Sequence, residues 1–164
     1  MHQTKILAPI FGILLLANCA ILKEPVIKKT KSIDNFQYAI LPVTSSKVST
    51  TGAVFGNPTG VYGSSSTKEV NPGALIEGFL LKRGMVVLTE VQPENKARTL
   101  IVRYGESGKR DVAGGLGGYT LEVTIVFTSA LTNEPVYSCT AEGQGSTEAD
   151  DIREAVERCL SGFN

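Results

Sequence analysis

The segment YTLEVTIVFTSAL, residues 119–131, alternates between apolar and polar side chains along most of its length, which is the period of a β-strand. A strand with this pattern belongs to a sheet that has one covered face and one face open to water. The fold must therefore supply a second layer that covers the apolar face. The residues on the covered side are Tyr119, Leu121, Val123, Ile125 and Phe127.

The covering layer is predicted near the end of the sequence, where residues 147–163 repeat apolar side chains at helical spacing. Thr147 can cap the first turn of this helix. Acidic residues at positions 148, 150 and 151 suit its positively polarised end, and we interpret them as partners of the helix dipole. The apolar stripe consists of Ile152, Ala155, Val156, Cys159, Leu160 and Phe163.

A second helix is predicted over NPGALIEGFLLKRG, residues 71–84. Asn71 is a suitable N-cap, Pro72 fits the first helical position, and Gly84 can adopt the left-handed conformation that ends a helix. Because this helix also has an apolar stripe, it should lie on the sheet as well. The stripe consists of Leu75, Ile76, Phe79 and Leu80.

Several further segments are predicted to be strands, and residues 92–98 a loop. The elements then follow the order β-α-β-β-β-β-α, with a possible hairpin inserted after the first strand. This order predicts an α+β fold, in which a mainly antiparallel sheet carries two helices on one face. The additional strands are predicted over residues 36–43, 85–91, 99–105 and 136–143.

Residues 44–70 are rich in serine, threonine and glycine, and they form either a protruding hairpin or a disordered insert. A few apolar residues interrupt this hydrophilic segment. They either contact a partner, for example by adding to a neighbouring sheet, or pack back on their own domain. These candidate interaction residues are Val54, Phe55, Val61 and Tyr62.

The stretch YGESGKRD, residues 104–111, resembles a phosphate-binding loop but lacks its spacing and its helix. Arg110 stands where that motif has a serine or threonine, and four glycines follow shortly afterwards. A nucleotide is therefore not expected as a ligand. Residues 105–118 are instead predicted to be a long, flexible hairpin connection. Lys109 and Arg110 near its tip either bind an anionic partner or stay solvated.

Near the start of the sequence, the charged residue Lys5 precedes an apolar run over residues 6–17. The segment LANC closes this run and ends at Cys19. LANC resembles the lipobox of bacterial lipoproteins, and this resemblance implies cleavage before Cys19 and diacylation of that residue. The alternative is ordinary signal cleavage near Ala20. The domains are then a signal peptide (1–18), a lipidated cysteine with a tether (19–35) and a periplasmic α+β domain (36–164). Because Ala20 is not an aspartate, the outer membrane is the expected location.

Loss of residues 1–18 would remove His2, the only histidine in the sequence. Catalytic arrangements and metal sites that need histidine are then excluded, so we expect no enzyme, no cofactor and no metal. Acidic and basic residues are nearly balanced, which argues against a nucleic-acid partner. Cys139 and Cys159 both point toward the predicted helix–sheet interface. In an oxidising compartment they either form a disulfide or remain buried thiols.

Residues 36–163 resemble a group of uncharacterised Gram-negative lipoproteins and, more loosely, small periplasmic α+β domains of envelope-assembly lipoproteins. The segments that carry the resemblance include GFLLKRG, RTLIVRYGESGKR and TEADDIREAVERCL. We therefore expect a non-enzymatic cell-envelope lipoprotein that is anchored through Cys19 and acts by protein–protein interaction. The alternative is a periplasmic module that binds a small molecule or glycan. Its aromatic platforms would be Tyr62, Tyr104, Tyr119 and Tyr137.

Overall fold

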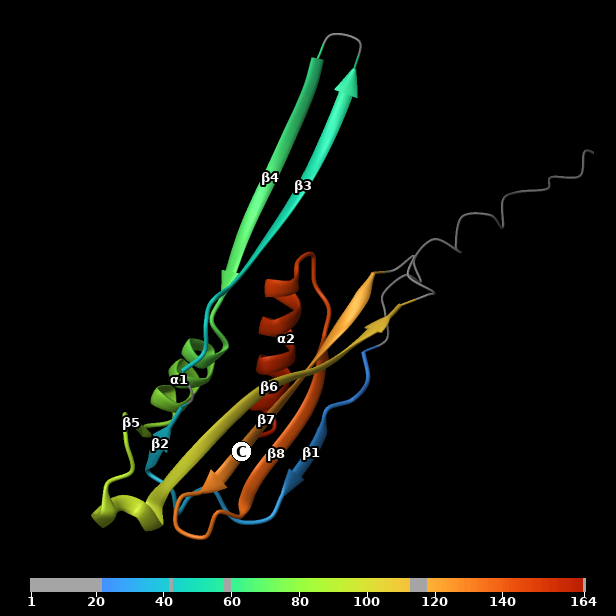
Figure 1. Cartoon of the computed structure of the whole chain (residues 1–164). Coiled ribbons are helices and arrows are strands. Elements are labelled where there is room, and N and C mark those ends of the chain that lie inside the picture. The colour runs from blue at the N-terminus through green and yellow to red at the C-terminus, as the bar shows by residue number, and fades with distance from the viewer. Residues whose placement is uncertain (1–21, 42, 58–59, 113–117, 164) are drawn as a thin grey trace, which may run out of the picture.

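The computed structural model describes residues 22–41, 43–57, 60–112 and 118–163, which form one main sheet, a separate hairpin and two helices (Figure 1). Six strands form the main sheet in the order β1-β8-β7-β6-β2-β5, and β3 pairs with β4 as a second sheet. The elements are β1 (Val26–Lys29), β2 (Tyr38–Ile40), β3 (Lys47–Asn57), β4 (Gly60–Val70), α1 (Pro72–Lys82), β5 (Val86–Leu88), the 3₁₀ helix η2 (Pro93–Arg98), β6 (Thr99–Asp111), β7 (Tyr119–Ser129), β8 (Pro135–Gly143) and α2 (Glu148–Ser161).

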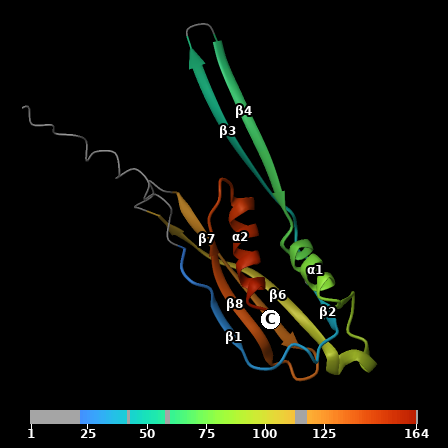
Figure 2. The same ribbon diagram turned by 180° about the vertical axis from the view of Figure 1, so that it is seen from behind.

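The predicted α+β fold is confirmed. Strands β1, β8, β7 and β6 pair in antiparallel fashion, whereas β2 lies parallel to both β6 and β5. Both helices cover the same face of the main sheet, with α2 over β7 and β8 (Figures 1 and 2). In the middle of β7 the alternation has the predicted cause, because the side chains that face the helices are buried and the intervening ones are partly exposed on the open face. The buried residues are Leu121, Val123, Ile125 and Phe127, and the intervening ones are Glu122, Thr124 and Val126.

Aromatic side chains fill the core between α2 and the sheet. The rings of Phe127 and Phe163 lie 4.2 Å apart, measured between centroids, and the ring of Tyr137 stands edge-on to Phe163 at 5.0 Å. All three side chains are fully buried. The Tyr137 hydroxyl donates a hydrogen bond to the Cys159 carbonyl oxygen at 2.5 Å, which satisfies its polar group inside the core.

A disulfide joins Cys139 on β8 to Cys159 on α2. Of the two predicted alternatives, a disulfide or two buried thiols, the structure has the disulfide. The two Cα atoms lie 5.4 Å apart, within the range that a disulfide spans. Both residues are buried at the helix–sheet interface. The bond therefore fixes α2 covalently to β8, one of the two strands that it covers.

Both helices begin as predicted. The Asn71 side chain accepts a hydrogen bond from the backbone N–H of Ala74, and the Thr147 hydroxyl accepts one from that of Asp150. Gly84 follows α1 with a φ of +77°, the left-handed conformation expected of it. The neighbouring strands are shorter than predicted, since β2 and β5 have three residues each. Residues 93–98, which were predicted to belong to a loop, form the 3₁₀ helix η2.

The first strand of the sheet lies in the segment that was predicted to be a tether. Strand β1 pairs in antiparallel fashion with β8, and its register places Ile27 opposite Cys139. The prediction that residues 19–35 form only a solvated linker misses this strand. All four β1 residues are exposed, although the Ile27 side chain reaches Gly162 at the end of α2, and no apolar alternation reveals the strand.

The predicted flexible connection over residues 105–118 is wrong for its first half. Strand β6 continues to Asp111 and pairs with β7 as far as the Asp111–Tyr119 pair. The register shifts between Glu106 and Gly108, which identifies Ser107 as the extra residue of a bulge. Lys109 and Arg110 therefore lie in a strand and not at a loop tip. Of the remaining connection, residues 113–117 lie outside the described part of the chain.

Removal of the disulfide should lower the free energy of unfolding. The two cysteines are separated by 20 residues, and closing a loop of this size stabilises a protein by about 3 kcal/mol. We expect the Cys139→Ala/Cys159→Ala variant to lose about that amount in urea denaturation. Addition of dithiothreitol should destabilise the wild-type protein but leave the variant unchanged. Equal unfolding midpoints for the oxidised protein and the variant would contradict this role.

Candidate interaction surface

The β3–β4 hairpin extends away from the body of the molecule, beyond the end at which α2 begins (Figures 1 and 2). Its two strands have 11 residues each, and their register runs without a shift from the Lys47–Val70 pair to the Asn57–Gly60 pair. The predicted insert is thus a hairpin. Phe55 and Tyr62 are opposite each other in this register. The side chains of the candidate residues Val54, Phe55, Val61 and Tyr62 lie outside the described part of the structure.

Polar contacts attach the base of the hairpin to the first turn of α2. The backbone N–H of Ala149 donates a hydrogen bond to the Ser49 hydroxyl at 3.1 Å. From the other strand, the Lys68 ammonium lies 2.7 Å from a carboxylate oxygen of Asp150 and 3.1 Å from the Ser146 hydroxyl. These contacts fix the direction in which the rest of the hairpin leaves the body.

Ion pairs join the adjacent part of β6 to the same region. The Lys109 ammonium lies 2.9 Å from a carboxylate oxygen of Glu148 and 4.6 Å from the centroid of the Tyr119 ring. The hydrogen bond to Lys109 lowers the pKa of Glu148, and the same bond raises the pKa of Lys109. Lys47 on β3 lies 3.3 Å from Glu106 on β6. Each of these lysines neutralises a carboxylate of a neighbouring element.

Glu142 at the end of β8 is a buried carboxylate with two cationic partners. Arg110 donates to its two oxygens, from Nε at 2.9 Å and from Nη2 at 2.7 Å. Lys23 contributes its backbone N–H at 3.1 Å and its ammonium group at 3.3 Å. The hydrogen bonds from Arg110 are the main cause that lowers the pKa of Glu142 to about 2. This carboxylate therefore remains charged at every physiological pH.

The cations predicted to meet an anionic partner, Lys109 and Arg110, thus have carboxylate partners within the chain. The partners, Glu148 and Glu142, belong to segments far away in the sequence, and sequence reasoning did not connect them. The idea that Lys109 or Arg110 also contacts another molecule stays a prediction.

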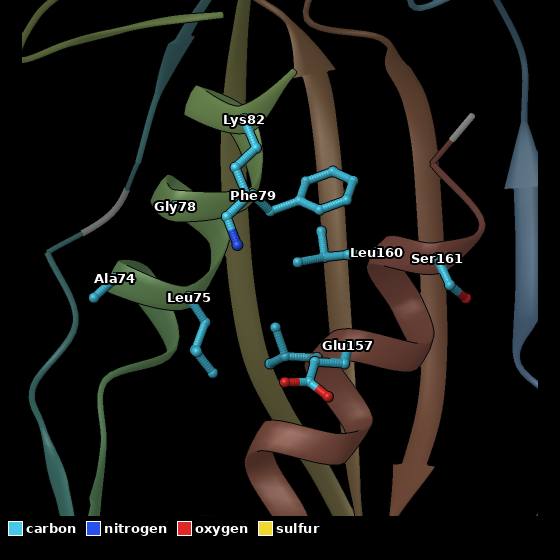
Figure 3. Close-up of a pocket in the computed structure, with 9 residues that line it drawn as sticks. Ala74, Leu75, Gly78, Phe79, Lys82, Glu157, Leu160 and Ser161 are labelled. Carbon is cyan, nitrogen blue, oxygen red and sulfur yellow. The ribbon is translucent and has the colours of Figure 1, made fainter. Parts of the chain in front are cut away.

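An apolar groove separates α1 from α2 on the helical face of the molecule (Figure 3). Its volume is about 350 Å³, and Phe79 from α1 and Leu160 from α2 point toward each other inside it. Lys82 and Glu157 supply charged groups at its border. No pattern in the sequence predicts this groove, because it arises only when the two helices lie side by side.

Of the four tyrosines proposed as a binding platform, the structure describes the side chains of three, and one of these lies in the core. Tyr137 is fully buried in the core, so it cannot serve as a platform. The Tyr119 ring lies beneath Lys109, and the Tyr104 hydroxyl is within 3.4 Å of Glu106. Burial and the neighbouring carboxylate raise the pKa of Tyr104 above its ordinary value. The side chain of Tyr62 lies outside the described residues.

Asp151 is the second carboxylate that the structure buries, and it lies in the first turn of α2. Its side chain is 3 % exposed and accepts a hydrogen bond from the backbone N–H of Gly145. Burial is the main cause that raises its pKa to about 6, and the negative charges of Asp150, Glu148 and Glu154 act in the same direction. No cation is close enough to form a salt bridge with it among the residues that the structure describes.

No protein-family model, curated protein or solved structure matches this chain. In the described ranges, no helix combines the length and the apolar character needed to cross a membrane. The same residues contain no group of three or more metal-binding side chains that could hold an ion. The candidate site therefore rests on the geometry of the hairpin and of its attachment to α2.

The buried charge of Asp151 should make stability depend on pH. Its folded-state pKa of about 6 exceeds the ordinary value of 3.8, so the folded protein retains a proton that the unfolded chain loses in this interval. The free energy of unfolding should fall as pH rises through this window. The Asp151→Asn variant keeps an acceptor for Gly145 but cannot ionise. We expect it to exceed the wild type in stability by about 1–3 kcal/mol above pH 6.

Urea denaturation at a series of pH values checks this expectation, and the two proteins should converge near pH 4. Asp150→Asn is the matched control, because the pKa of Asp150 is lowered by its hydrogen bonds with Lys68 and Ser146. That variant should be less stable than the wild type at neutral pH. A lower free energy of unfolding for Asp151→Asn than for the wild type at pH 7 would show that the buried negative charge does not destabilise the protein.

Proposed function

We propose that this protein is an exported, lipid-anchored protein of the cell envelope that performs no catalysis and acts through protein contacts made by the β3–β4 hairpin. One observation carries the proposal. The hairpin forms a sheet of its own that projects from the body, and in the described structure each of its strands pairs only with the other (Figure 1).

The geometry of the hairpin suits recognition by strand addition. A two-stranded ribbon has two outer edges, whose N–H and C=O groups can pair with an extended segment of a partner. Residues 65–69 along β4 are exposed, so they are accessible to such a segment. An isolated two-stranded hairpin is only marginally stable in water. Contact with a partner would add apolar burial to such a hairpin.

The proposed anchor rests on the resemblance of LANC to a lipobox. Diacylation of Cys19 would give a stable attachment, because two acyl chains bind a membrane far more firmly than one. The absence of aspartate at position 20 favours the outer membrane, with the domain facing the periplasm. An oxidising compartment would also maintain the bond between Cys139 and Cys159.

Shortening the hairpin should abolish partner binding without unfolding the body. Thr51 and Ser66 are opposite each other in the ladder, an even number of residues from the Asn57–Gly60 pair, so residues 52–65 can be replaced by an Asn-Gly turn. The truncation keeps the contacts of Ser49 and Lys68 with α2. A photo-crosslinking amino acid at Ser65 of the full-length protein would first identify the partner in cells. We then expect the truncated protein to lose that partner in co-purification.

Two controls make this experiment decisive. A crosslinker at Lys96, an exposed residue of η2 distant from the hairpin, should give no adduct with the same partner. The Thr132→Lys variant, altered at the opposite end of the sheet, should retain the partner in full. An unchanged thermal unfolding temperature would show that the truncated protein is folded. Equal recovery of the partner by full-length and truncated proteins would refute the role of the hairpin.

The groove between α1 and α2 supports a second candidate function, the binding of a small apolar molecule (Figure 3). A Cβ atom added at Gly78, which lines the groove, meets no atom within 4 Å, so the side chain of Gly78→Leu has room to enter the groove and should occupy part of it. We expect this variant to lose the fluorescence enhancement of an apolar dye that binds the wild type. Leu81→Ala, at an exposed position of the same helix, serves as the control. Unchanged dye binding in Gly78→Leu would exclude the groove.

A further inference from the structure

The chain is fixed to the folded body almost immediately after Cys19. Both backbone polar groups of Lys23 are bonded, since its N–H donates to Glu142 and its carbonyl oxygen accepts from Nη2 of Arg158 at 2.7 Å. The other terminal nitrogen of Arg158 donates to the Glu142 carbonyl oxygen at 2.6 Å. Three residues later the chain enters β1 and the main sheet. Lys23 is therefore part of the domain and not of a linker.

This attachment leaves very little free chain between Cys19 and the domain. Only residues 20–22 separate Cys19 from Lys23. A chain spans at most about 3.6 Å per residue, so the two Cα atoms can be no more than ~14 Å apart. An anchor at Cys19 would thus hold Lys23 within that distance of the place where the acyl chains enter the bilayer.

The position of Lys23 also determines which end of the molecule faces the anchor. Lys23 contacts Glu142, which lies just before the β8–α2 turn, and Glu142 contacts Arg110 near the end of β6. We call the surface formed by Lys23, Arg110, Asp111 and the turn at residues 144–147 the anchor end. The β7–β8 turn at Thr132 lies at the opposite end, because the 11 residues of β7 separate the two. That separation is about 35 Å at the rise of an antiparallel strand.

The charges at the anchor end are compatible with a lipid surface. Its cations are matched by carboxylates of the same region, as in the pairs that Arg110 forms with Glu142 and Lys109 with Glu148. The described residues of this surface are polar and nearly neutral in sum, so they are neither repelled by anionic head groups nor forced into the hydrocarbon. The short spacer, and not a strong electrostatic attraction, would hold the two together.

We propose that the anchor end rests directly against the membrane surface, so that the domain is held in one orientation instead of swinging on a tether. This inference rests on the proposed acylation of Cys19. The base of the hairpin contacts Ser146 and Asp150, beside the anchor end. The hairpin leaves the body at this same end and projects beyond it (Figure 1), so it starts close to the lipid head groups and must run along the membrane surface and not into the bilayer. Its partner should be a protein embedded in the same membrane.

Depth-dependent fluorescence quenching tests this orientation in the intact lipidated protein. The Asp111→Cys and Thr132→Cys variants each provide one exposed thiol for a bimane label, since Cys139 and Cys159 are bonded to each other. The labelled proteins are reconstituted in vesicles of phosphatidylethanolamine and phosphatidylglycerol with spin-labelled head groups. We expect strong quenching of the label at residue 111 and none at residue 132.

A spacer variant provides the matched control. Insertion of 12 Gly/Ser residues between Ala20 and Ile21 adds a flexible reach of about 20 Å. The insertion leaves every described contact intact, so quenching at residue 111 should be lost while the unfolding temperature stays the same. Arg158→Ala, which releases the Lys23 carbonyl, should increase hydrogen exchange at the Lys23 amide and weaken the quenching in part.

The outcomes distinguish this inference from the proposed function. Equal quenching at residues 111 and 132, or quenching that the spacer does not change, would overturn the fixed orientation. Mass spectrometry of the same material reports on the anchor separately. Protein without acyl groups on Cys19 would refute the proposed anchor, whereas acylated protein with no quenching at residue 111 would refute the orientation alone.

Discussion

The packing of α2 on β7 and β8 is the contact on which the other parts of the molecule depend. The buried stripe of α2 covers the apolar face of the sheet, and Cys159 ties it covalently to β8. Its first turn receives the base of the hairpin, through Ala149 and Asp150. From its last turns Arg158 reaches the N-terminal segment. Displacement of α2 would therefore disturb the core, the hairpin and the N-terminal attachment together.

The elements that the sequence predicts well are those whose signals are local. The alternation from Tyr119 to Phe127 arises because one face of β7 is buried and the other is open, so the burial of the strand can be read directly from its sequence. The caps at Asn71 and Thr147 are equally local, since each bonds to the backbone three residues ahead. The cysteine pair could be placed at the helix–sheet interface because both residues lie on apolar faces of predicted elements. Its oxidised state was one of two open alternatives.

The features that sequence reasoning missed depend on contacts between distant segments. Strand β1 has no apolar face, and its pairing with β8 uses backbone groups that every sequence provides. The extension of β6 is hidden by glycines at positions 105 and 108, which suggested a flexible connection. The chemistry of Arg110 was recognised, but its partner Glu142 could not be, because only the alignment of β6, β7 and β8 brings the two together. The groove between the helices has the same origin.

Strand β1 has a mechanical consequence if the proposed anchor at Cys19 exists and tension acts on it. Tension from a membrane would enter at Lys23 and pass through β1 to β8, its only neighbour in the described sheet. Strand β8 is bonded through Cys139 to α2, and Arg158 of α2 also bonds the Lys23 carbonyl, so both layers would share the load. The exposed edge strand β1 would then be the part that detaches first under load. It could peel away and re-form while the cross-linked core kept its shape.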